Sequence, residues 1–486
     1  MPLSAERMSR VDTAWLRMDN DVNLMMIVGI WLLEPAVPYD MLCERVADKL
    51  LKYDRFRQKV VQDTFGPSWV EDTDFDIGRH VLREPLTRKR GESERKALQR
   101  RAGDLANTAL DPAHPLWQFH LIEKYEGGSA MVARIHHCIG DGISLVSVMM
   151  SITDGGKDPP RRLPRGKRGA KIDGDGDGDG DGDDAGAWLS DAVLGPLTDM
   201  TVKAIGMTGQ GVAKSLSALS HPERGSLDLM RTGMQALGDV AALAMMPDDS
   251  PTRLKGKPAG KKIVAWGEPI PLPAVKAIGK ALGCSVNDVL LACVAGAIGH
   301  YLRDKGDDTE GQEIRAMVPV NLRPLDQAWQ LGNRFGLAPL VLPIGIANPI
   351  ERVYAVRTRM NQLKGSFQPL LAFAVLAVSG LTIKPVQDAI LGLFAKKATA
   401  VMTNVPGPAV PLQFCGATLR QTMFWVPASG DIGVGVSVLS YGGGVQFGLI
   451  TDQKLCPDPQ AVIDRFEPEF ENLMFVTLML PWGDAA

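Results

Sequence analysis

The residues best suited to chemistry lie in one seven-residue stretch. It reads His136-His137-Cys138-Ile139-Gly140-Asp141-Gly142, an HHxxxDG pattern. A neutral imidazole within hydrogen-bond reach of a hydroxyl can take its proton as that oxygen attacks. One such base is enough for acyl transfer from a thioester, because a thiolate, whose thiol has a pKa of about 8.5, leaves without an acid. The chain has no GxSxG elbow, so the motif favours direct transfer to a hydroxyl.

The segment before the motif must position these groups, and its alternation predicts a β-hairpin. Residues 115–123 and 130–137 read as two strands around a turn at 125–128. Side chains on a strand change face at every residue, so His136 and His137 point to opposite faces. Adjacent strand histidines are poor co-ligands, and the chain has no HExxH or CxxC spacing, so we expect no metal site. One structural alternative stays open, in which both histidines are satisfied strand residues beside an ordinary Asp-Gly turn.

Four further motifs accompany HHxxxDG in a fixed order. They are Pro115-Leu116-Trp117, Ser285-Val286-Asn287-Asp288, Met317-Val318-Pro319-Val320-Asn321-Leu322-Arg323-Pro324 and Thr403-Asn404-Val405-Pro406-Gly407-Pro408. From about Ser9 to about Phe470, this set resembles the bacterial wax ester synthase/diacylglycerol acyltransferase family. The wider superfamily includes chloramphenicol acetyltransferase and peptide-synthetase condensation domains. The resemblance implies an α/β fold, in which two chloramphenicol-acetyltransferase-like subdomains with mixed sheets enclose a tunnel and are joined by a helical connector.

The resemblance also implies roles for the motif residues. His137 would be the general base that deprotonates an alcohol, while His136 and Asp141 would hold the loop. Asp141 would pair with an arginine of the other subdomain, for which Arg323 is the best match. A buried aspartate is costly unless it is paired. Gly142 would let the backbone turn tightly or approach a ligand.

Two asparagines have competing explanations. Asn287 could donate a hydrogen bond to a developing oxyanion, or either Ser285 or Asn287 could cap a helix that begins at Asp288. Asn404 is close to Pro406-Gly407-Pro408, so its main expected role is in a loop of fixed shape. A role in the active site is the alternative. Many relatives carry Pro-Met-His-Val-Gly near the N-terminus, where this chain reads Asn23-Leu24-Met25-Met26-Ile27-Val28-Gly29. Many also carry a serine directly before the Asn-Val-Pro-Gly-Pro motif, where this chain has Thr403. These departures bear on acceptor preference and leave the transfer step intact.

The activity that the resemblance implies is O-acyl transfer. The acyl group would move from acyl-CoA to a long-chain alcohol, giving a wax ester, and/or to diacylglycerol, giving triacylglycerol. Acyl-CoA would be a substrate, and we expect no cofactor. Two alternatives share the fold, a condensation-type acyltransferase with another acceptor and a non-catalytic lipid-binding protein. The first predicts neighbouring carrier domains, and the second predicts no release of coenzyme A.

Length and composition agree with two domains in a cytoplasmic protein. A chain of 486 residues is longer than a single hydrophobic core usually supports. Its net charge of −3 does not indicate a nucleic-acid partner. The six cysteines are scattered and no signal segment is evident, which favours a reducing cytoplasm. We expect an N-terminal subdomain over residues 1–160, a disordered linker over 161–186, a helical connector over 187–255 and a C-terminal subdomain over 256–486.

Two segments bear on contact with lipid. Residues 161–171 hold six basic side chains and residues 173–184 hold seven acidic ones, in Asp-Gly repeats that cannot bury apolar area. The basic run could meet anionic lipid or simply attract its acidic neighbour. The apolar stretch Leu370 to Ile383 falls short of the roughly 20 residues that span a bilayer. It could be a core helix or a surface that docks on a membrane or lipid inclusion.

Overall fold

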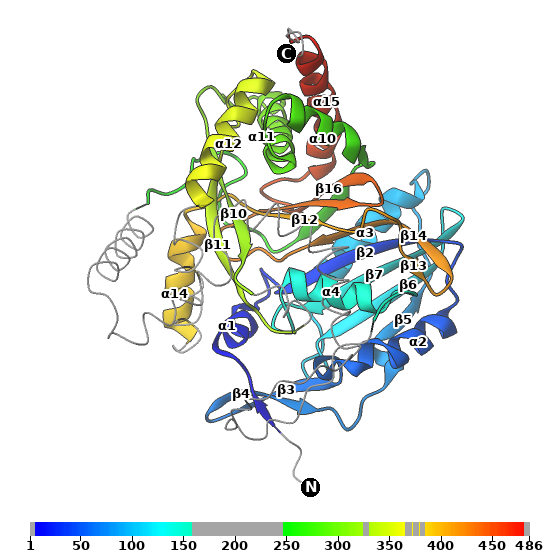
Figure 1. Ribbon diagram of the computed structural model, residues 1–486. Coiled ribbons are helices and arrows are strands. Elements are labelled where there is room, and N and C mark those ends of the chain that lie inside the picture. Colours follow the sequence, from blue (N-terminus) through cyan, green and yellow to red (C-terminus); the bar gives the residue numbers. More distant parts are fainter. Residues whose placement is uncertain are drawn as a thin grey trace, which may run out of the picture.

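The computed structural model describes residues 5–157, 246–323, 330–364, 372, 379 and 384–480. Two mixed β-sheets lie one above the other, and most of the helices of the C-terminal half cover the outer face of the upper sheet (Figure 1). The expected linker over 161–186 lies outside the described residues, as do residues 187–245 of the expected helical connector. The described end of that connector, residues 246–255, contains no helix.

The N-terminal half is built on a six-stranded sheet. Its strand order is β13-β14-β2-β7-β6-β5, in which only β5 and β6 pair in parallel. The strands are β2 (Met26–Glu34), β5 (Val81–Glu84), β6 (Trp117–Tyr125), β7 (Gly128–His136), β13 (Gln413–Phe414) and β14 (Ala417–Trp425). A small separate sheet pairs β1 (Glu6–Arg7), β4 (Gly66–Glu71) and β3 (Gln58–Asp63).

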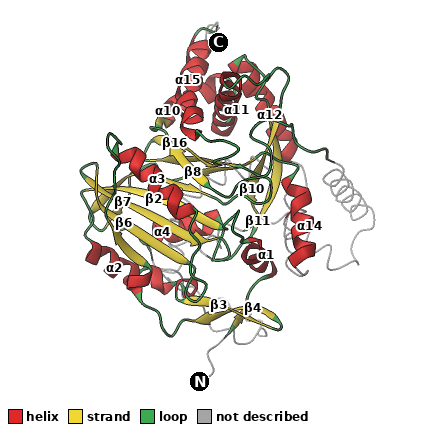
Figure 2. Ribbon diagram, turned by 180° about the vertical axis from the view of Figure 1, so that it is seen from behind, coloured by secondary structure: helices red, strands yellow, loops and turns green. Residues whose placement is uncertain are grey.

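Among the described residues of the N-terminal half, four α-helices and three short 3-10 helices accompany these sheets. They are α1 (Arg10–Met18), α2 (Tyr39–Asp48), α3 (Glu94–Ala106), α4 (Gly142–Ser151), η1 (Leu50–Lys52), η2 (Asp54–Phe56) and η3 (Ile77–Arg79). Apolar residues of α3, among them Leu98 and Leu105, pack against both β2 and the C-terminal strand that carries Trp266. Helix α3 therefore lies between the two sheets (Figure 2).

The C-terminal half contains the second sheet, in the order β11-β10-β12-β15-β16-β8, with β9 pairing β16. Strand β12 runs parallel to both β10 and β15. The strands are β8 (Lys262–Trp266), β9 (Ile270–Pro271), β10 (Ile314–Asn321), β11 (Phe335–Leu342), β12 (Ala400–Pro406), β15 (Val434–Tyr441) and β16 (Gly444–Asp452). The helices are α10 (Leu272–Ala281), α11 (Val286–Asp304), α12 (Pro349–Lys364), α14 (Lys384–Ala395) and α15 (Pro459–Leu478).

The C-terminal half of the chain contributes two strands to the N-terminal sheet. Strands β13 and β14 belong to the C-terminal half in sequence, yet β14 pairs with β2 over most of its length. The N-terminal sheet is therefore completed by residues 413–425, and a boundary at residue 256 does not separate the two sheets. Both expected hairpins are present, since β6 pairs with β7 and β15 pairs with β16.

Helix α11 shows how local sequence fixes an element. Ser285 caps its N-terminus by accepting from the Asp288 backbone N–H, and the Asp288 carboxylate accepts in turn from the Ser285 N–H. This reciprocal capping box satisfies two otherwise orphaned donors. The helix consequently begins at Val286, two residues earlier than expected, and Asn287 lies within its first turn. Within the part of the chain that the structure describes, no single helix is long and apolar enough to span a bilayer, although α10 and α11 pass that test as a pair bent by 102°.

Candidate active site

The HHxxxDG motif occupies the end of β7 and the turn into α4. The His137 N–H donates to the Met25 carbonyl at 2.7 Å, so pairing with the segment before β2 extends past the end of the strand. The turn is closed by the Ile139 N–H, which donates to the His136 carbonyl at 3.0 Å. The hairpin of β6 and β7 thus places the two histidines at the end of a central strand of the sheet.

His137 lies in an aromatic environment. Its imidazole stacks on the Trp15 indole with ring centroids 4.0 Å apart and planes 8° apart, and Phe335 lies 5.6 Å away. Burial lowers the pKa of His137 to about 4, because a charged imidazolium is disfavoured away from water. The imidazole is therefore neutral at pH 7 and able to accept a proton.

His136 lies apart from His137, as strand alternation predicted. Its Nδ1 accepts from the Cys138 N–H at 3.1 Å, and its Nε2 lies 3.8 Å from a carboxylate oxygen of Asp19. These contacts support the turn. Of the two histidines, His137 is the one that contacts Trp15 and Phe335.

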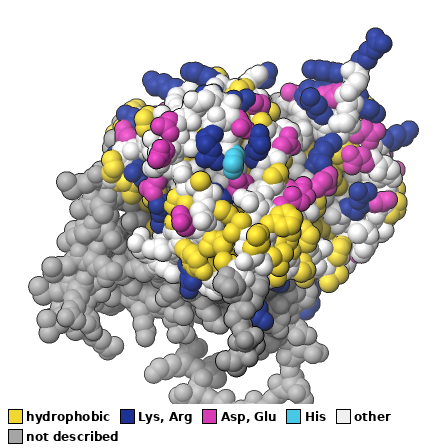
Figure 3. Space-filling view, turned by 90° about the horizontal axis from the view of Figure 1, so that it is seen from above, with side chains coloured by type: hydrophobic (Ala, Val, Ile, Leu, Met, Phe, Trp, Pro, Cys, Tyr) yellow, Lys and Arg dark blue, Asp and Glu magenta, His cyan; other side chains and the backbone are white. Residues whose placement is uncertain are grey.

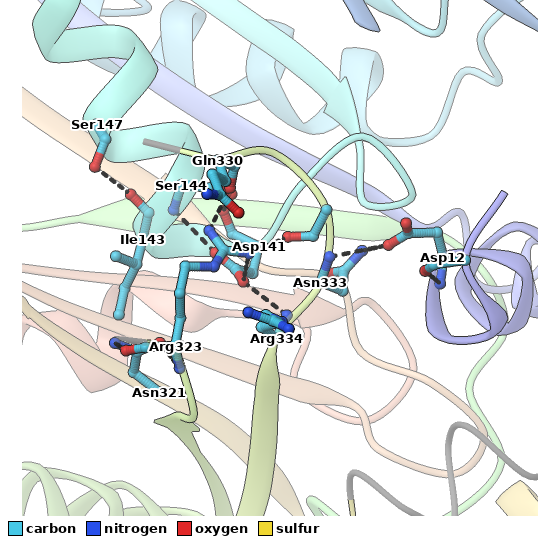
Figure 4. Close-up of polar contacts among 12 residues, drawn as sticks. Asp12, Asp141, Ile143, Ser144, Ser147, Asn321, Arg323, Gln330, Asn333 and Arg334 are labelled. Atoms are coloured by element: carbon cyan, nitrogen blue, oxygen red, sulfur yellow. Dashed lines mark hydrogen bonds and ion pairs between the residues drawn. The ribbon is translucent and has the colours of Figure 1, made fainter. Parts of the chain in front are cut away.

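Asp141 connects the motif to the other half of the molecule (Figure 4). One carboxylate oxygen accepts from the Ser144 N–H at 2.9 Å and caps α4. The other lies 3.1 Å from the Arg323 Nη2 and accepts from the Arg334 N–H at 3.0 Å. Burial lowers the pKa of Arg323, and the Asp141 charge opposes this effect. The ion pair that the sequence suggested is present, and both of its side chains are buried.

Of the two roles expected for Gly142, the structure does not support the tight turn, and the close approach to a ligand remains a prediction. Gly142 is the first residue of α4 and its φ is not positive, so the turn does not require glycine. An added Cβ would make only ordinary contact with Phe424, at 3.9 Å. Gly142 lines an apolar pocket, where the missing side chain leaves room beside Phe424.

Asn287 and Asn404 come together, but not at the base. The Asn404 Nδ2 donates to the Asn287 Oδ1 at 2.7 Å. Asn404 shares a strand face with Ala400 and Met402, which belong to the core beneath α11. Among the described contacts, none brings either asparagine to His137, and a direct oxyanion role for Asn287 gains no support from this arrangement.

Two further polar residues hold the motif, and the sequence did not reveal them. Asp12 accepts from the Asn333 N–H at 2.9 Å and from its Nδ2 at 2.8 Å. The same amide group donates to the His137 carbonyl at 2.7 Å. Residues 12 and 333 are far apart in sequence, so no spacing could have linked them. The only available signal was a polar residue three positions before Trp15 on an otherwise apolar helix face.

Two apolar pockets lie close to the HHxxxDG motif, although His137 itself lines neither of them. The first lies between the N-terminal sheet and α4 and includes residues of the last motif; its wall includes Ile27, Ile135, Gly142, Leu145, Gly407, Pro408 and Leu439. The second lies beside α1 and α14; its wall includes Trp15, Met18, Met317, Leu337, Leu391 and Phe394. Ile135 is two residues before His137, and Trp15 stacks on it. Each pocket therefore comes near the base through a neighbouring residue, Ile135 or Trp15, and its lining suits an apolar chain.

Known proteins resemble this chain over its whole length. The family description "Wax ester synthase/diacylglycerol acyltransferase catalytic domain" matches residues 8–290, and "WS/DGAT C-terminal domain" matches residues 331–474. The probable diacylglycerol O-acyltransferase tgs1 of Mycobacterium tuberculosis is 24% identical over 483 residues, which cover 97% of this chain and 96% of that protein.

Solved structures show the same fold. The wax ester synthase/diacylglycerol acyltransferase from Marinobacter aquaeolei VT8 has a TM-score of 0.64 at 20% identity, covering 98% of this chain and 100% of that one. The first condensation domain of the CDA synthetase has a TM-score of 0.56 at 14% identity, covering 97% and 96%. The expected two-subdomain α/β architecture is confirmed.

Proposed function

Because the chain belongs to the wax ester synthase/diacylglycerol acyltransferase family, we propose that His137 is the general base of its O-acyl transfer reaction. The enzyme moves an acyl group to a long-chain alcohol, to diacylglycerol or to both. Acyl-CoA is the proposed donor. The observation that carries the assignment is a buried, neutral imidazole of the HHxxxDG motif that stacks on Trp15, whose side chain also lines an apolar pocket.

The proposed chemistry needs one proton acceptor. The Nδ1 of His137 is enclosed and has no hydrogen-bond partner among the described residues, so Nε2 is the nitrogen that would take the proton of the acceptor hydroxyl. The oxygen attacks the thioester carbonyl as the O–H bond breaks. The tetrahedral intermediate collapses, the C–S bond breaks, and the thiolate of coenzyme A receives the proton from the imidazolium.

Replacement of the base tests this assignment. We expect His137→Ala to lower the rate of coenzyme A release by about 10²–10⁴-fold, the usual contribution of a positioned base. The measurement is a thiol assay with a long-chain acyl-CoA and either hexadecanol or diacylglycerol. His114→Ala, which removes a histidine paired with Asp72 in another part of the N-terminal half, should keep the wild-type rate. A His137→Ala enzyme with full activity would exclude the mechanism.

The acceptor and the place of action are separate proposals. Comparing hexadecanol with diacylglycerol in the same assay would assign wax ester or triacylglycerol synthesis. We also propose a cytoplasmic enzyme that contacts membranes or lipid inclusions at its periphery, because its acceptors and products partition into lipid.

The helical end of the molecule could provide such a contact. Apolar side chains gather there into a continuous area (Figure 3), and the end of α15 exposes Phe475, Leu478 and Met479. Flotation with phospholipid vesicles that contain triacylglycerol would test the proposal. Failure of the protein to rise with the vesicles would contradict it.

A further inference from the structure

Helix α1 presents two side chains to the base from one face. Asp12 and Trp15 are three residues apart, so they lie on the same side of the helix. Both are buried. Trp15 contacts the ring of His137, and Asp12 reaches its backbone through Asn333. The ring and the backbone of the base are thus both held from the N-terminal helix.

The contact between the two rings can stabilise a positive charge on the His137 imidazole as well as fix its orientation. The two planes are almost parallel and their centroids are 4.0 Å apart. A cation within about 6 Å of an aromatic centroid is attracted by the negative face of the ring, and most strongly by indole. Any positive charge that develops on His137 during proton transfer would form directly over Trp15.

We propose that Trp15 is a positioning residue for the reaction. Its indole fixes the plane of the His137 imidazole and stabilises the imidazolium that forms as the acceptor loses its proton. The inference rests on the proposed role of His137 as the base.

The surroundings keep the indole in place. The buried Gln387 of α14 donates to the Ala14 carbonyl at 2.9 Å, and Lys384 donates to the Arg17 carbonyl at 2.7 Å. Helix α1 is therefore tied to α14 by two hydrogen bonds. Phe335 packs against both Trp15 and His137, with centroids 5.9 and 5.6 Å away. The base cannot change its ring plane without displacing one of these aromatic side chains.

Two substitutions at one position separate the parts of this role. Trp15→Phe keeps an aromatic face but removes the indole N–H, which is buried and has no partner among the described residues. Trp15→Leu removes the face as well. We expect Trp15→Leu to lower kcat about tenfold with the KM of each substrate within about twofold of wild type, and Trp15→Phe to restore most of the kcat.

Trp266→Phe and Trp266→Leu are matched controls. Trp266 is equally buried, but it packs against Trp425 and α3 in a different core. These controls should keep the wild-type kcat even if they lower the melting temperature. Circular dichroism of every variant would confirm that the fold is retained.

Three results would overturn the proposal. An unchanged kcat in Trp15→Leu would show that the stacking has no kinetic role. An equal loss in Trp15→Phe and Trp15→Leu would assign the effect to the indole N–H. A rise in KM that accounts for the whole loss would make Trp15 a wall of the second pocket and nothing more.

An experiment without turnover separates this inference from the proposed function. In protein with ¹³C-labelled histidine, the His137 ring signal, assigned with His137→Ala, should be shifted upfield by the indole ring current. Trp15→Leu should abolish that shift and Trp15→Phe should keep part of it. Absence of the shift in the wild type would refute the stacking itself. A wild-type enzyme that shows the shift but releases no coenzyme A would refute the proposed function instead.

Discussion

At the scale of single residues, the protonation state of His137 has a kinetic consequence. The base works only when neutral, and burial lowers its pKa to about 4. Activity should therefore stay high as the pH falls through 6 and be lost only as it approaches 4. An ordinary histidine, with a pKa of about 6.5, would leave only about a tenth of the enzyme active at pH 5.5.

The pH dependence of kcat/KM checks this expectation, since it reports groups of the free enzyme. Brief exposure to each pH followed by assay at pH 7 would separate titration from unfolding. An acidic limb with a midpoint near 6.5 would show that the base is open to water in solution, and it would contradict the buried geometry.

The motif residues could be predicted better than the residues that support them. The family resemblance implied the pairing of Asp141 with Arg323, which the structure contains, whereas the role of His137 as the base remains a prediction. Asp12 and Asn333 could not be predicted, because their hydrogen bonds depend on how the two halves pack. The room left by Gly142 depends on the position of Phe424 in the same way.

At the scale of elements, Asp141 joins the start of α4 to the end of β10. The carboxylate caps the helix with one oxygen and binds Arg323 with the other. Asp141→Asn keeps an oxygen for the cap but leaves the buried guanidinium without its counter-charge. Breaking a buried pair in this way costs about 3–5 kcal/mol, so the free energy of unfolding should fall by that amount.

Urea unfolding of Asp141→Asn and of Arg323→Met measures this cost. Arg83→Met, which breaks an exposed pair with Glu123, should change the free energy of unfolding by less than about 1 kcal/mol. Wild-type stability in both buried-pair variants would mean that the pair does not join the halves.

Elements with a strong local signal were the ones predicted well. The hairpin of β6 and β7 and that of β15 and β16 follow from alternation around glycine turns. The start of α11 was misplaced by two residues, because Ser285 and Asn287 offer competing caps and only the geometry selects Ser285.

At the scale of the whole molecule, no alternation pattern could reveal that the C-terminal half completes the N-terminal sheet. Strands carry no mark of their distant partners, and β14 pairs with β2 across almost 400 residues of chain. Without β14, β2 would become an unprotected edge strand. Without β2, the apolar side chains of β14 that contact the N-terminal core, such as Leu419, would face water.

The two halves should therefore not fold independently. We expect residues 246–486, expressed alone, to be insoluble or to lack a cooperative thermal transition, and residues 1–245 to behave likewise. Co-expression should restore a soluble complex, because the pairing of β14 with β2 and the Asp141–Arg323 pair can form between two chains as they do within one. Co-purification through a tag on one fragment, followed by thermal melting, measures this. A fragment 246–486 that unfolds cooperatively as a monomer would show that β14 does not need the N-terminal sheet, and that the site is formed by docking of two finished domains.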